Sequence, residues 1–285
     1  MPTWFQAAIF DVDGVVVDSP HERAWRDALG QLMETSWRAI RDRTTYAPER
    51  FTPELYHAQM SGKPTMSGAR AALEYFHVPD TEERIEQYGE RKQQIVDEIL
   101  AAEGVTAYAD ALRFILAVRD AGILVSAASS SKNASRLLAR IWLDTFAEEQ
   151  GLHYAFLRPE LALLEVFDAD VSGRDFAHGK PDPEIFLTAA RELGLPPSAC
   201  FVVEDAVSGI QAAKAGGMAA LGLARAVDVD VLVAAHAELV VTSLDHVDVS
   251  ALSAGRLARK AGAPTLREHR HAPPSRCTSE TDFPS

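Results

Sequence analysis

The segment FQAAIFDVDGV, residues 5–15, joins a short apolar run to two carboxylates and a glycine. A run of this kind is typical of a strand that is buried on both faces. Asp11 and Asp13 are two residues apart, so in a continuing strand their side chains point to the same face, and Gly14 permits a sharp turn just beyond them. Paired carboxylates suit Mg²⁺, which prefers oxygen ligands. The alternative is a turn without chemistry, because Asp and Gly are ordinary turn residues.

The composition narrows the classes of protein to consider. The chain has 285 residues, of which 47% are hydrophobic, and a formal net charge of -13. This is enough apolar material for one large domain or two, while the negative charge argues against a nucleic-acid partner. The two cysteines, Cys200 and Cys277, predict no disulfide framework and favour a reducing cytoplasm. No apolar run approaches the roughly 20 residues of a membrane span and no export signal is recognisable, so no membrane partner is expected.

Apolar runs at 123–128, 200–203 and 219–223 precede helix-like segments at 132–142, 207–216 and 228–235. This alternation predicts an α/β fold with a doubly wound parallel sheet. The region from about 21 to 100 has helical periodicity and no convincing strand, which predicts a small inserted helical domain. The predicted organisation is therefore core at 1–18, helical domain at 19–101, core again at 102–249 with an insertion of unassigned role at 144–165, and a disordered tail at 250–285.

Polar residues follow each predicted strand, at the edge where open α/β sheets bind ligands. The strand at 123–128 is followed by Ser129, Ser130, Ser131, Lys132 and Asn133, which could cradle a phosphate at the start of a helix. Lys180 stands on a proline-bounded turn before the next helix, where an ammonium could neutralise a phosphoryl group. Glu204 and Asp205 end a further apolar strand and would complete a metal site. Alone, the serine cluster is equally consistent with a helix cap, and a single lysine would usually lie on the surface. The apolar approach to Glu204 and Asp205 argues against a random acidic loop, and together the motifs predict one site.

This series of motifs resembles the haloacid dehalogenase superfamily of phosphotransferases over roughly residues 5–225. The resemblance implies that Asp11 attacks phosphorus to form an aspartyl phosphate, and that Asp13 acts as general acid and base. Ser129 and Lys180 would hold the transferring phosphoryl group. Mg²⁺ would be bound by Asp11, the backbone carbonyl of Asp13 and Asp205, with Glu204 as a further ligand or as a support for the ligands.

The inserted helical domain resembles the cap of the superfamily's first subclass, and three segments are similar to the β-phosphoglucomutase-like subfamily: 21–25, 91–92 and 131–133. The resemblance assigns a set of residues to binding of the sugar phosphate: His21, Trp25, Gly62, Lys63, Lys92, Ser130, Ser131, Lys132 and Asn133. Taken alone, His21 would be a helix N-terminal residue, Trp25 a core residue and Lys92 a solvated one. Two departures stand out. Two residues are missing between Asp18 and His21, and Thr65 stands where the subfamily has an arginine, which Lys63 would replace as a point charge.

These residues predict a monomeric, Mg²⁺-dependent enzyme that converts β-glucose 1-phosphate to glucose 6-phosphate. A phosphatase acting on a small phosphorylated sugar is the alternative, because both reactions use the same core residues. A binding or regulatory protein without turnover is the third hypothesis, and the joint presence of Asp11, Asp13, Ser129, Lys180 and Asp205 argues against it.

Overall fold

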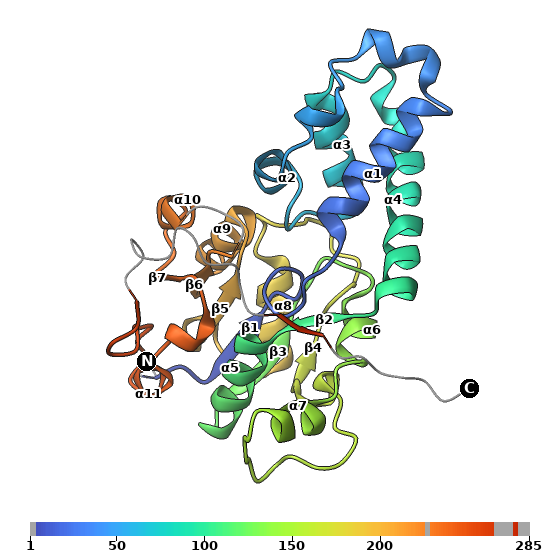
Figure 1. The fold of residues 1–285 in the computed structure, drawn as a ribbon. Coiled ribbons are helices and arrows are strands. Elements are labelled where there is room, and N and C mark those ends of the chain that lie inside the picture. The colour runs from blue at the N-terminus through green and yellow to red at the C-terminus, as the bar shows by residue number, and fades with distance from the viewer. Residues whose placement is uncertain (1–3, 226–228, 265–275, 279–285) are drawn as a thin grey trace, which may run out of the picture. The chain divides into compact units, whose positions relative to one another are not determined.

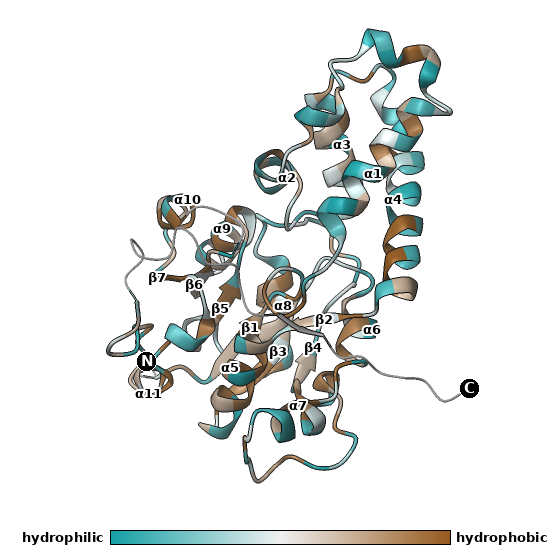
Figure 2. Ribbon diagram, viewed as in Figure 1, coloured by the Kyte–Doolittle hydropathy of each residue, from teal (hydrophilic) through white to brown (hydrophobic). Residues whose placement is uncertain are grey.

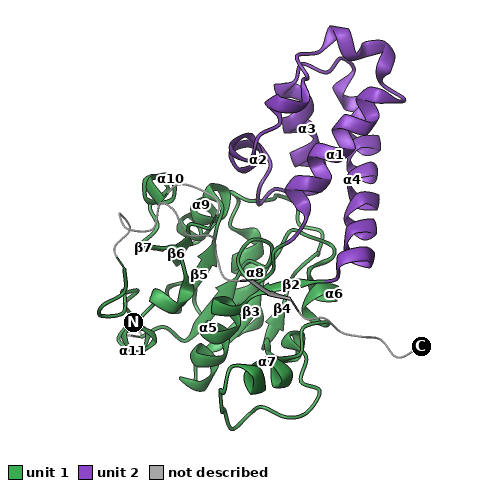
Figure 3. Cartoon of the chain, viewed as in Figure 1, with its two compact units in different colours: residues 1–18, 105–285 green, residues 19–104 purple. Residues whose placement is uncertain are grey.

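The computed structural model describes residues 4–225, 229–264 and 276–278 of the chain (Figure 1). The chain divides into two compact units, of which unit 1 comprises residues 1–18 and 105–285 and unit 2 comprises residues 19–104 (Figure 3). The prediction ended the helical domain at 101, whereas the structural division falls after Gly104.

Unit 1 contains a six-stranded sheet, a two-stranded sheet and the helices that surround them. Its strands are β1 (Ala7–Phe10), β2 (Thr106–Tyr108), β3 (Leu124–Ala127), β4 (Ala169–Asp170), β5 (Cys200–Glu204), β6 (Ala219–Leu223), β7 (Leu239–Val241) and β8 (Arg276–Thr278). Its α-helices are α5 (Ala109–Asp120), α6 (Ala134–Leu138), α7 (Leu143–Glu149), α8 (Glu184–Glu192), α9 (Val207–Ala215), α10 (Val229–Ala234) and α11 (Val249–Leu252). Short 3₁₀ turns are η3 (Leu163–Val166), η4 (Pro197–Ala199) and η5 (Leu244–His246).

The large sheet has the strand order β4-β3-β1-β5-β6-β7, and neighbouring strands pair in parallel. The first strand of the chain is central, since Ala7 pairs with Leu124 on one side and Cys200 on the other. This arrangement confirms the predicted parallel α/β fold. It also brings the carboxyl ends of β1, β3 and β5 to one edge.

The alternation of side chains along β1 explains why helices pack on both faces of the sheet. Ala7 and Ile9 belong to a buried cluster with Phe186 of α8 and Ile210 of α9. Phe10 points to the opposite face, where its ring lies 6.1 Å from that of Phe114 in α5. The strand is therefore apolar at every position, as Figure 2 shows by the brown colour of the central strands.

Unit 2 is helical throughout, with α1 (His21–Glu34), η1 (Arg38–Arg43), η2 (Pro48–Arg50), α2 (Pro53–Gln59), α3 (Thr65–Tyr75) and α4 (Thr81–Glu103). Its core includes three large aromatic side chains. The ring of Tyr88 lies edge-on to Trp25 at 4.8 Å and to Trp37 at 6.4 Å, and its hydroxyl donates to the carbonyl of Trp25 at 2.9 Å. These contacts hold α1 against α4.

The insertion at 144–165 contains most of α7 and the start of η3, and it is closed at its base. The N–H of Leu143 donates to the carbonyl of Leu161, and the N–H of Leu163 donates to the carbonyl of Ile141, both at 2.8 Å. Leu161 and Leu163 are buried there. Because the chain enters this pairing at Ile141, α6 ends at Leu138 and the helix predicted over 132–142 is shorter than expected.

The structure differs from the prediction of a disordered tail from residue 250. Ala251 and Leu252 are buried in α11, and the guanidinium of Arg259 donates to the carbonyls of Val240 and Pro264, each at 2.8 Å. Further along, β8 pairs antiparallel with β2. The sequence shows no apolar periodicity here because these residues pack through a few scattered contacts. The remainder of the predicted tail, 265–275 and 279–285, lies outside the described residues. Within the part of the chain that the structure describes, no helix is both long and apolar enough to span a membrane.

Candidate active site

Backbone hydrogen bonds fix the ends of the three central strands. The N–H of Asp11 donates to the carbonyl of Val203 at 3.0 Å, and the N–H of Ala128 donates to the carbonyl of Phe10 at 2.8 Å. The sheet ladder therefore continues as far as the residues that carry the predicted chemistry. Asp11, Ser129 and Glu204 consequently meet at the same edge of the sheet.

Lys180 lies at the centre of this edge. Its Nζ atom donates to Oδ1 of Asp11 and to Oε1 of Glu204, each at 2.6 Å. The lysine side chain is fully buried, and its ammonium lies 4.9 Å from the centre of the Phe186 ring. An ammonium enclosed in this way is strongly held by its two carboxylate partners.

The pKa values of these groups reflect an excess of buried acids. Burial raises the pKa of Asp11, and the nearby Glu204 and Asp13 raise it further, against the attraction of the Lys180 ammonium. Burial raises the pKa of Asp205 as well, and Glu204 and Asp11 add to the effect. For Lys180, burial alone would lower the pKa, but Asp11 and Glu204 raise it above its ordinary value. The lysine thus stays charged, and the carboxylates favour an additional cation.

Asp13 has different surroundings from Asp11. Its Oδ2 atom accepts a hydrogen bond from the hydroxyl of Ser129 at 2.8 Å. The same hydroxyl oxygen accepts from the N–H of Ser131 at 3.0 Å, and the N–H of Ser129 donates to the Ser172 hydroxyl at 3.2 Å. The Lys180 ammonium thus contacts Asp11, and the Ser129 hydroxyl contacts Asp13.

The acids at this edge fit a divalent cation. Carboxylate oxygens of Asp11, Glu204 and Asp205 all lie within 4.8 Å of one another. Glu204 is already engaged at both oxygens, because Oε1 accepts from Lys180 and Oε2 accepts from the N–H of Ala206 at 2.8 Å. Asp11 and Asp205 are thus better placed to offer oxygens to Mg²⁺, while Glu204 holds Lys180.

The remaining predicted residues of unit 1 follow β3. Lys132 is exposed and pairs with Asp175, whereas Asn133 is buried and accepts from the Arg136 guanidinium at 3.0 Å. Ser130 and Ser131 are half-buried. The helix after them, α6, has only 5 residues, so the contribution of a helix dipole to anion binding, which the sequence suggested, is small.

Unit 2 holds the other predicted residues. Lys92 is 4% exposed, with its ammonium 5.3 Å from the centre of the Trp25 ring, so the alternative interpretation of Lys92 as a solvated residue is wrong. His21 is the first residue of α1 and is buried. Gly62 adopts a positive φ of 75° after α2, and the neighbouring Lys63 is half-buried.

Sequence reasoning missed Gly209, which shapes the site by leaving room for a buried acid. A Cβ atom on Gly209 would overlap the carboxylate of Glu204, so only glycine leaves room for that buried acid. Glycine is unfavourable inside a helix, and its presence in the first turn of α9 was the available signal. Ser172 was also missed, since it follows the two-residue strand β4, which is too short to be recognised by its pattern.

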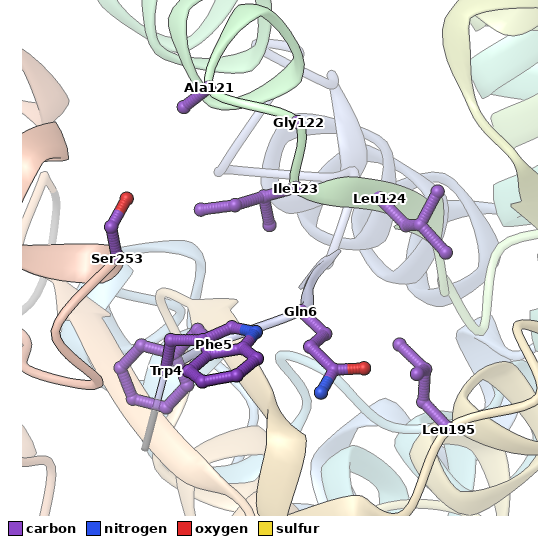
Figure 4. Close-up of a pocket in the computed structure, with 9 residues that line it drawn as sticks. All are labelled: Trp4, Phe5, Gln6, Ala121, Gly122, Ile123, Leu124, Leu195 and Ser253. Carbon is purple, nitrogen blue, oxygen red and sulfur yellow. The ribbon is translucent and has the colours of Figure 1, made fainter. Parts of the chain in front are cut away.

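A cavity of about 420 Å³ lies elsewhere in unit 1 (Figure 4). Trp4, Phe5 and Gln6 line it before β1, together with Gly122 and Ile123 before β3. It therefore lies at the amino ends of the strands, and none of the predicted site residues contributes to it.

Comparison with known proteins agrees with this arrangement. A family model described as haloacid dehalogenase-like hydrolase matches residues 5–217. The chain belongs to this family. As a haloacid dehalogenase-like hydrolase, it is 31% identical over 231 residues to a β-phosphoglucomutase of Mycobacterium bovis, covering 77% of this chain and 80% of that one. It is also 26% identical to a phosphorylated carbohydrates phosphatase of Thermotoga maritima, with 75% and 82% of the two chains covered.

Among solved structures, the archaeal β-phosphoglucomutase of a Pyrococcus species superposes on this haloacid dehalogenase-like hydrolase with a TM-score of 0.62. The two chains are 26% identical, and the match covers 88% of this chain and 99% of the other. The predicted superfamily and β-phosphoglucomutase-like subfamily are therefore confirmed. The chain is an enzyme of the phosphatase or phosphomutase kind.

Proposed function

We propose that the protein is a Mg²⁺-dependent β-phosphoglucomutase, which transfers a phosphoryl group on a sugar phosphate through a phosphorylated Asp11. The observation that carries this proposal is the unlike pairing of the two aspartates. Asp11 contacts the Lys180 ammonium at 2.6 Å, whereas Asp13 contacts the Ser129 hydroxyl at 2.8 Å. A nucleophile must be ionised, which the Lys180 ammonium and a Mg²⁺ ion bound beside it would both favour for Asp11. A proton-transfer group must be able to change its protonation state, which a hydroxyl partner permits for Asp13.

In the first half of the reaction, a carboxylate oxygen of Asp11 attacks phosphorus and the bond from phosphorus to the leaving oxygen breaks. Asp13 donates its proton to that oxygen, so the leaving group departs as a neutral alcohol. Lys180 favours the ionised form of Asp11 and, together with Ser129, offers positive charge and a hydrogen-bond donor to the phosphoryl oxygens.

In the second half, Asp13 accepts a proton from the hydroxyl group that attacks the phosphorylated Asp11. Transfer to the other hydroxyl of the sugar completes the isomerisation, and transfer to water gives hydrolysis. Asp11 and Asp205 would hold Mg²⁺, which supplies neutralisation of the charge on the phosphoryl oxygens. Glu204 supports this arrangement by fixing Lys180.

The test supplies the purified protein with β-glucose 1-phosphate, Mg²⁺ and a trace of the bisphosphate, and follows glucose 6-phosphate and free phosphate together. Formation of glucose 6-phosphate without free phosphate is the expected result. The Asp11→Asn variant is the control and should form neither product. Release of free phosphate alone would contradict mutase activity and support the alternative.

Two observations favour that alternative, a phosphatase acting on a small phosphorylated sugar. The Thermotoga relative carries a phosphatase name. In addition, Thr65 begins α3 at the position where the subfamily has an arginine, and Lys63 can offer only a point charge instead of a bidentate fork. A weakly held distal phosphate would favour release of the intermediate over its second use.

A further inference from the structure

Arg225 follows β6 and links three separate segments of unit 1. Its guanidinium donates to Oδ1 of Asp110 at 2.7 Å and to the carbonyl of Val15 at 3.3 Å, and lies 3.8 Å from the centre of the Tyr108 ring. Both charged side chains are only 4% exposed. Val15 is two residues beyond Asp13, so this buried guanidinium reaches the loop that carries the proposed proton-transfer group.

Asp110 is a firm anchor for this arginine. Its Oδ2 atom accepts from the Ser243 hydroxyl at 2.9 Å and from the N–H of Leu244 at 2.8 Å, and its Oδ1 atom also accepts from the N–H of Ala111 at 3.0 Å. Because these donors fix the Asp110 carboxylate independently of Arg225, the carboxylate can hold the Arg225 guanidinium in one orientation. Buried ion pairs contribute little net stability compared with apolar packing, so a role in positioning better explains this one.

The loop that Arg225 contacts is held at successive carbonyls. The carbonyl of Val15 accepts from Arg225, and the carbonyl of Val16 accepts from the N–H of Tyr108 at 3.0 Å. The Tyr108 hydroxyl also donates to Asp18 at 3.0 Å. Asp18 is the last residue of unit 1 before the chain enters unit 2, and Tyr108 lies just after it returns. Arg225 and Tyr108 therefore brace the whole stretch between Asp13 and that crossing.

We propose that Arg225 is a positioning residue for Asp13, acting through the carbonyl of Val15 to hold the proton-transfer group in place. The inference rests on the proposed function, in which Asp13 protonates the leaving oxygen. Asp11 is fixed separately by the sheet and by Lys180. Loss of Arg225 should therefore impair protonation of the leaving group while nucleophilic attack is largely retained.

Two aryl phosphates of nearly equal size separate these effects. Phenyl phosphate needs a proton on its leaving oxygen, whereas 4-nitrophenyl phosphate releases a more acidic phenol that leaves without one. The ratio kcat/KM covers only the steps up to departure of the leaving group, so it reports phosphorylation of Asp11 for both. In Arg225→Met, kcat/KM should fall about 30-fold with phenyl phosphate and less than about 3-fold with 4-nitrophenyl phosphate, since general acid catalysis contributes at least about 100-fold when intact.

The matched control is Arg113→Met. Arg113 lies on the same helix as Asp110 and pairs with Asp245 at 2.6 Å, in the 3₁₀ turn that also holds Leu244. Its side chain is 28% exposed, whereas that of Arg225 is 4% exposed. It should change kcat/KM for the two substrates by the same small factor. Arg225→Lys keeps a buried positive charge for Asp110 and guards against loss of the fold, yet it lacks the planar fork and should still show the selective loss.

An equal loss of kcat/KM with both aryl phosphates in Arg225→Lys and Arg225→Met would overturn the positioning role, because a structural defect lowers both alike. Retention of both activities would overturn it as well. If the wild-type protein cleaves neither ester and transfers no phosphate from β-glucose 1-phosphate, the proposed function fails together with the inference. The wild-type and variant measurements therefore distinguish the two failures.

Discussion

The carboxylate of Asp205 occupies the space that a Cβ atom on Gly14 would need. Gly14 also has a positive φ of 84°, which other residues adopt at a cost. Asp205, one of the two proposed Mg²⁺ ligands, therefore packs directly on the turn that follows Asp11 and Asp13. Glycine is required at position 14 both to make room for this carboxylate and to adopt the positive φ.

Substitution of Gly14 by alanine should abolish Mg²⁺ binding and lower turnover by about 100-fold or more, since small displacements of catalytic groups have effects of this size. Gly122→Ala is the matched control, because Gly122 has a similar φ of 76° but nothing within 4 Å of an added Cβ. The control should lose about 1 kcal/mol of stability from the left-handed backbone alone and keep its activity. Calorimetric Mg²⁺ titration and thermal unfolding measure both effects, and equal behaviour of the two variants would contradict the overlap argument.

Asp11→Asn should remove all turnover without weakening the fold. Burial raises the pKa of Asp11, which means that burying the ionised carboxylate costs free energy in the metal-free protein. The asparagine should therefore raise the unfolding midpoint at pH 8 without Mg²⁺, while Lys180 keeps Glu204 as a partner. Differential scanning calorimetry with an activity assay tests this, and residual turnover would show that Asp11 is not the nucleophile.

The stabilisation by Mg²⁺ should grow with pH. The pKa of Asp11 lies above its ordinary 3.8 in the folded protein, so the contribution of this group to stability is greatest at low pH and is lost as the pH rises through the folded value. Mg²⁺ takes the place of the lost proton. We expect a larger Mg²⁺-induced rise of the unfolding midpoint at pH 8 than at pH 6, and a flatter dependence in Asp11→Asn. A response independent of pH in the wild type would be inconsistent with metal binding at this carboxylate.

Asp110→Asn should destabilise the protein by about 3 kcal/mol at pH 7, because it leaves the Arg225 guanidinium buried without its counter-ion. Burial alone would raise the pKa of Asp110, but Arg225 and the donors around it hold that pKa below its ordinary 3.8. The stability that the ionised carboxylate provides is thus fully present above pH 3.8 and is lost as the pH falls through the folded value. Urea unfolding should show the difference from wild type shrinking in acid; a constant difference would exclude the charge as its cause.

Lys92→Met should reduce kcat/KM for sugar phosphates by about 10-fold or more, the loss expected when a charged hydrogen bond to phosphate is removed. Turnover of 4-nitrophenyl phosphate should change little. Arg91→Met is the control, since the adjacent Arg91 is bonded to Gln31, Gln94 and Glu98 on the surface of unit 2. An equal loss on both classes of ester would count against a role of Lys92 in sugar-phosphate binding.

The sheet and the residues at its edge were predictable because both follow from local patterns. Apolar runs mark strands buried on two faces, and parallel strands align their carboxyl ends, so Asp11, Ser129 and Glu204 could be placed together before any distance was known. The contacts of Lys180 could not be predicted from a local pattern. Its proline-bounded turn indicated a candidate site residue, but its 2.6 Å contacts with Asp11 and Glu204 depend on how α8 packs on the sheet.

Other features lacked a local signal. Arg225 looks like an ordinary residue after a strand, and its partner Asp110 is distant in the sequence, so nothing in either neighbourhood reveals the pair. The segment after residue 250 was predicted to be disordered because its composition is polar. Its order as far as 264 depends on single contacts such as the one between Arg259 and the Val240 carbonyl, which periodicity does not detect.

The central position of β1 has a consequence for biosynthesis. Ala7 is synthesised well before its partner strands, which begin at Leu124 and Cys200, so unit 1 cannot complete its sheet until those later segments have left the ribosome. Unit 2 is contiguous from 19 to 104, and its helices need only nearby partners. Unit 2 can therefore fold first, while the apolar strand β1 is still unpaired and prone to aggregation.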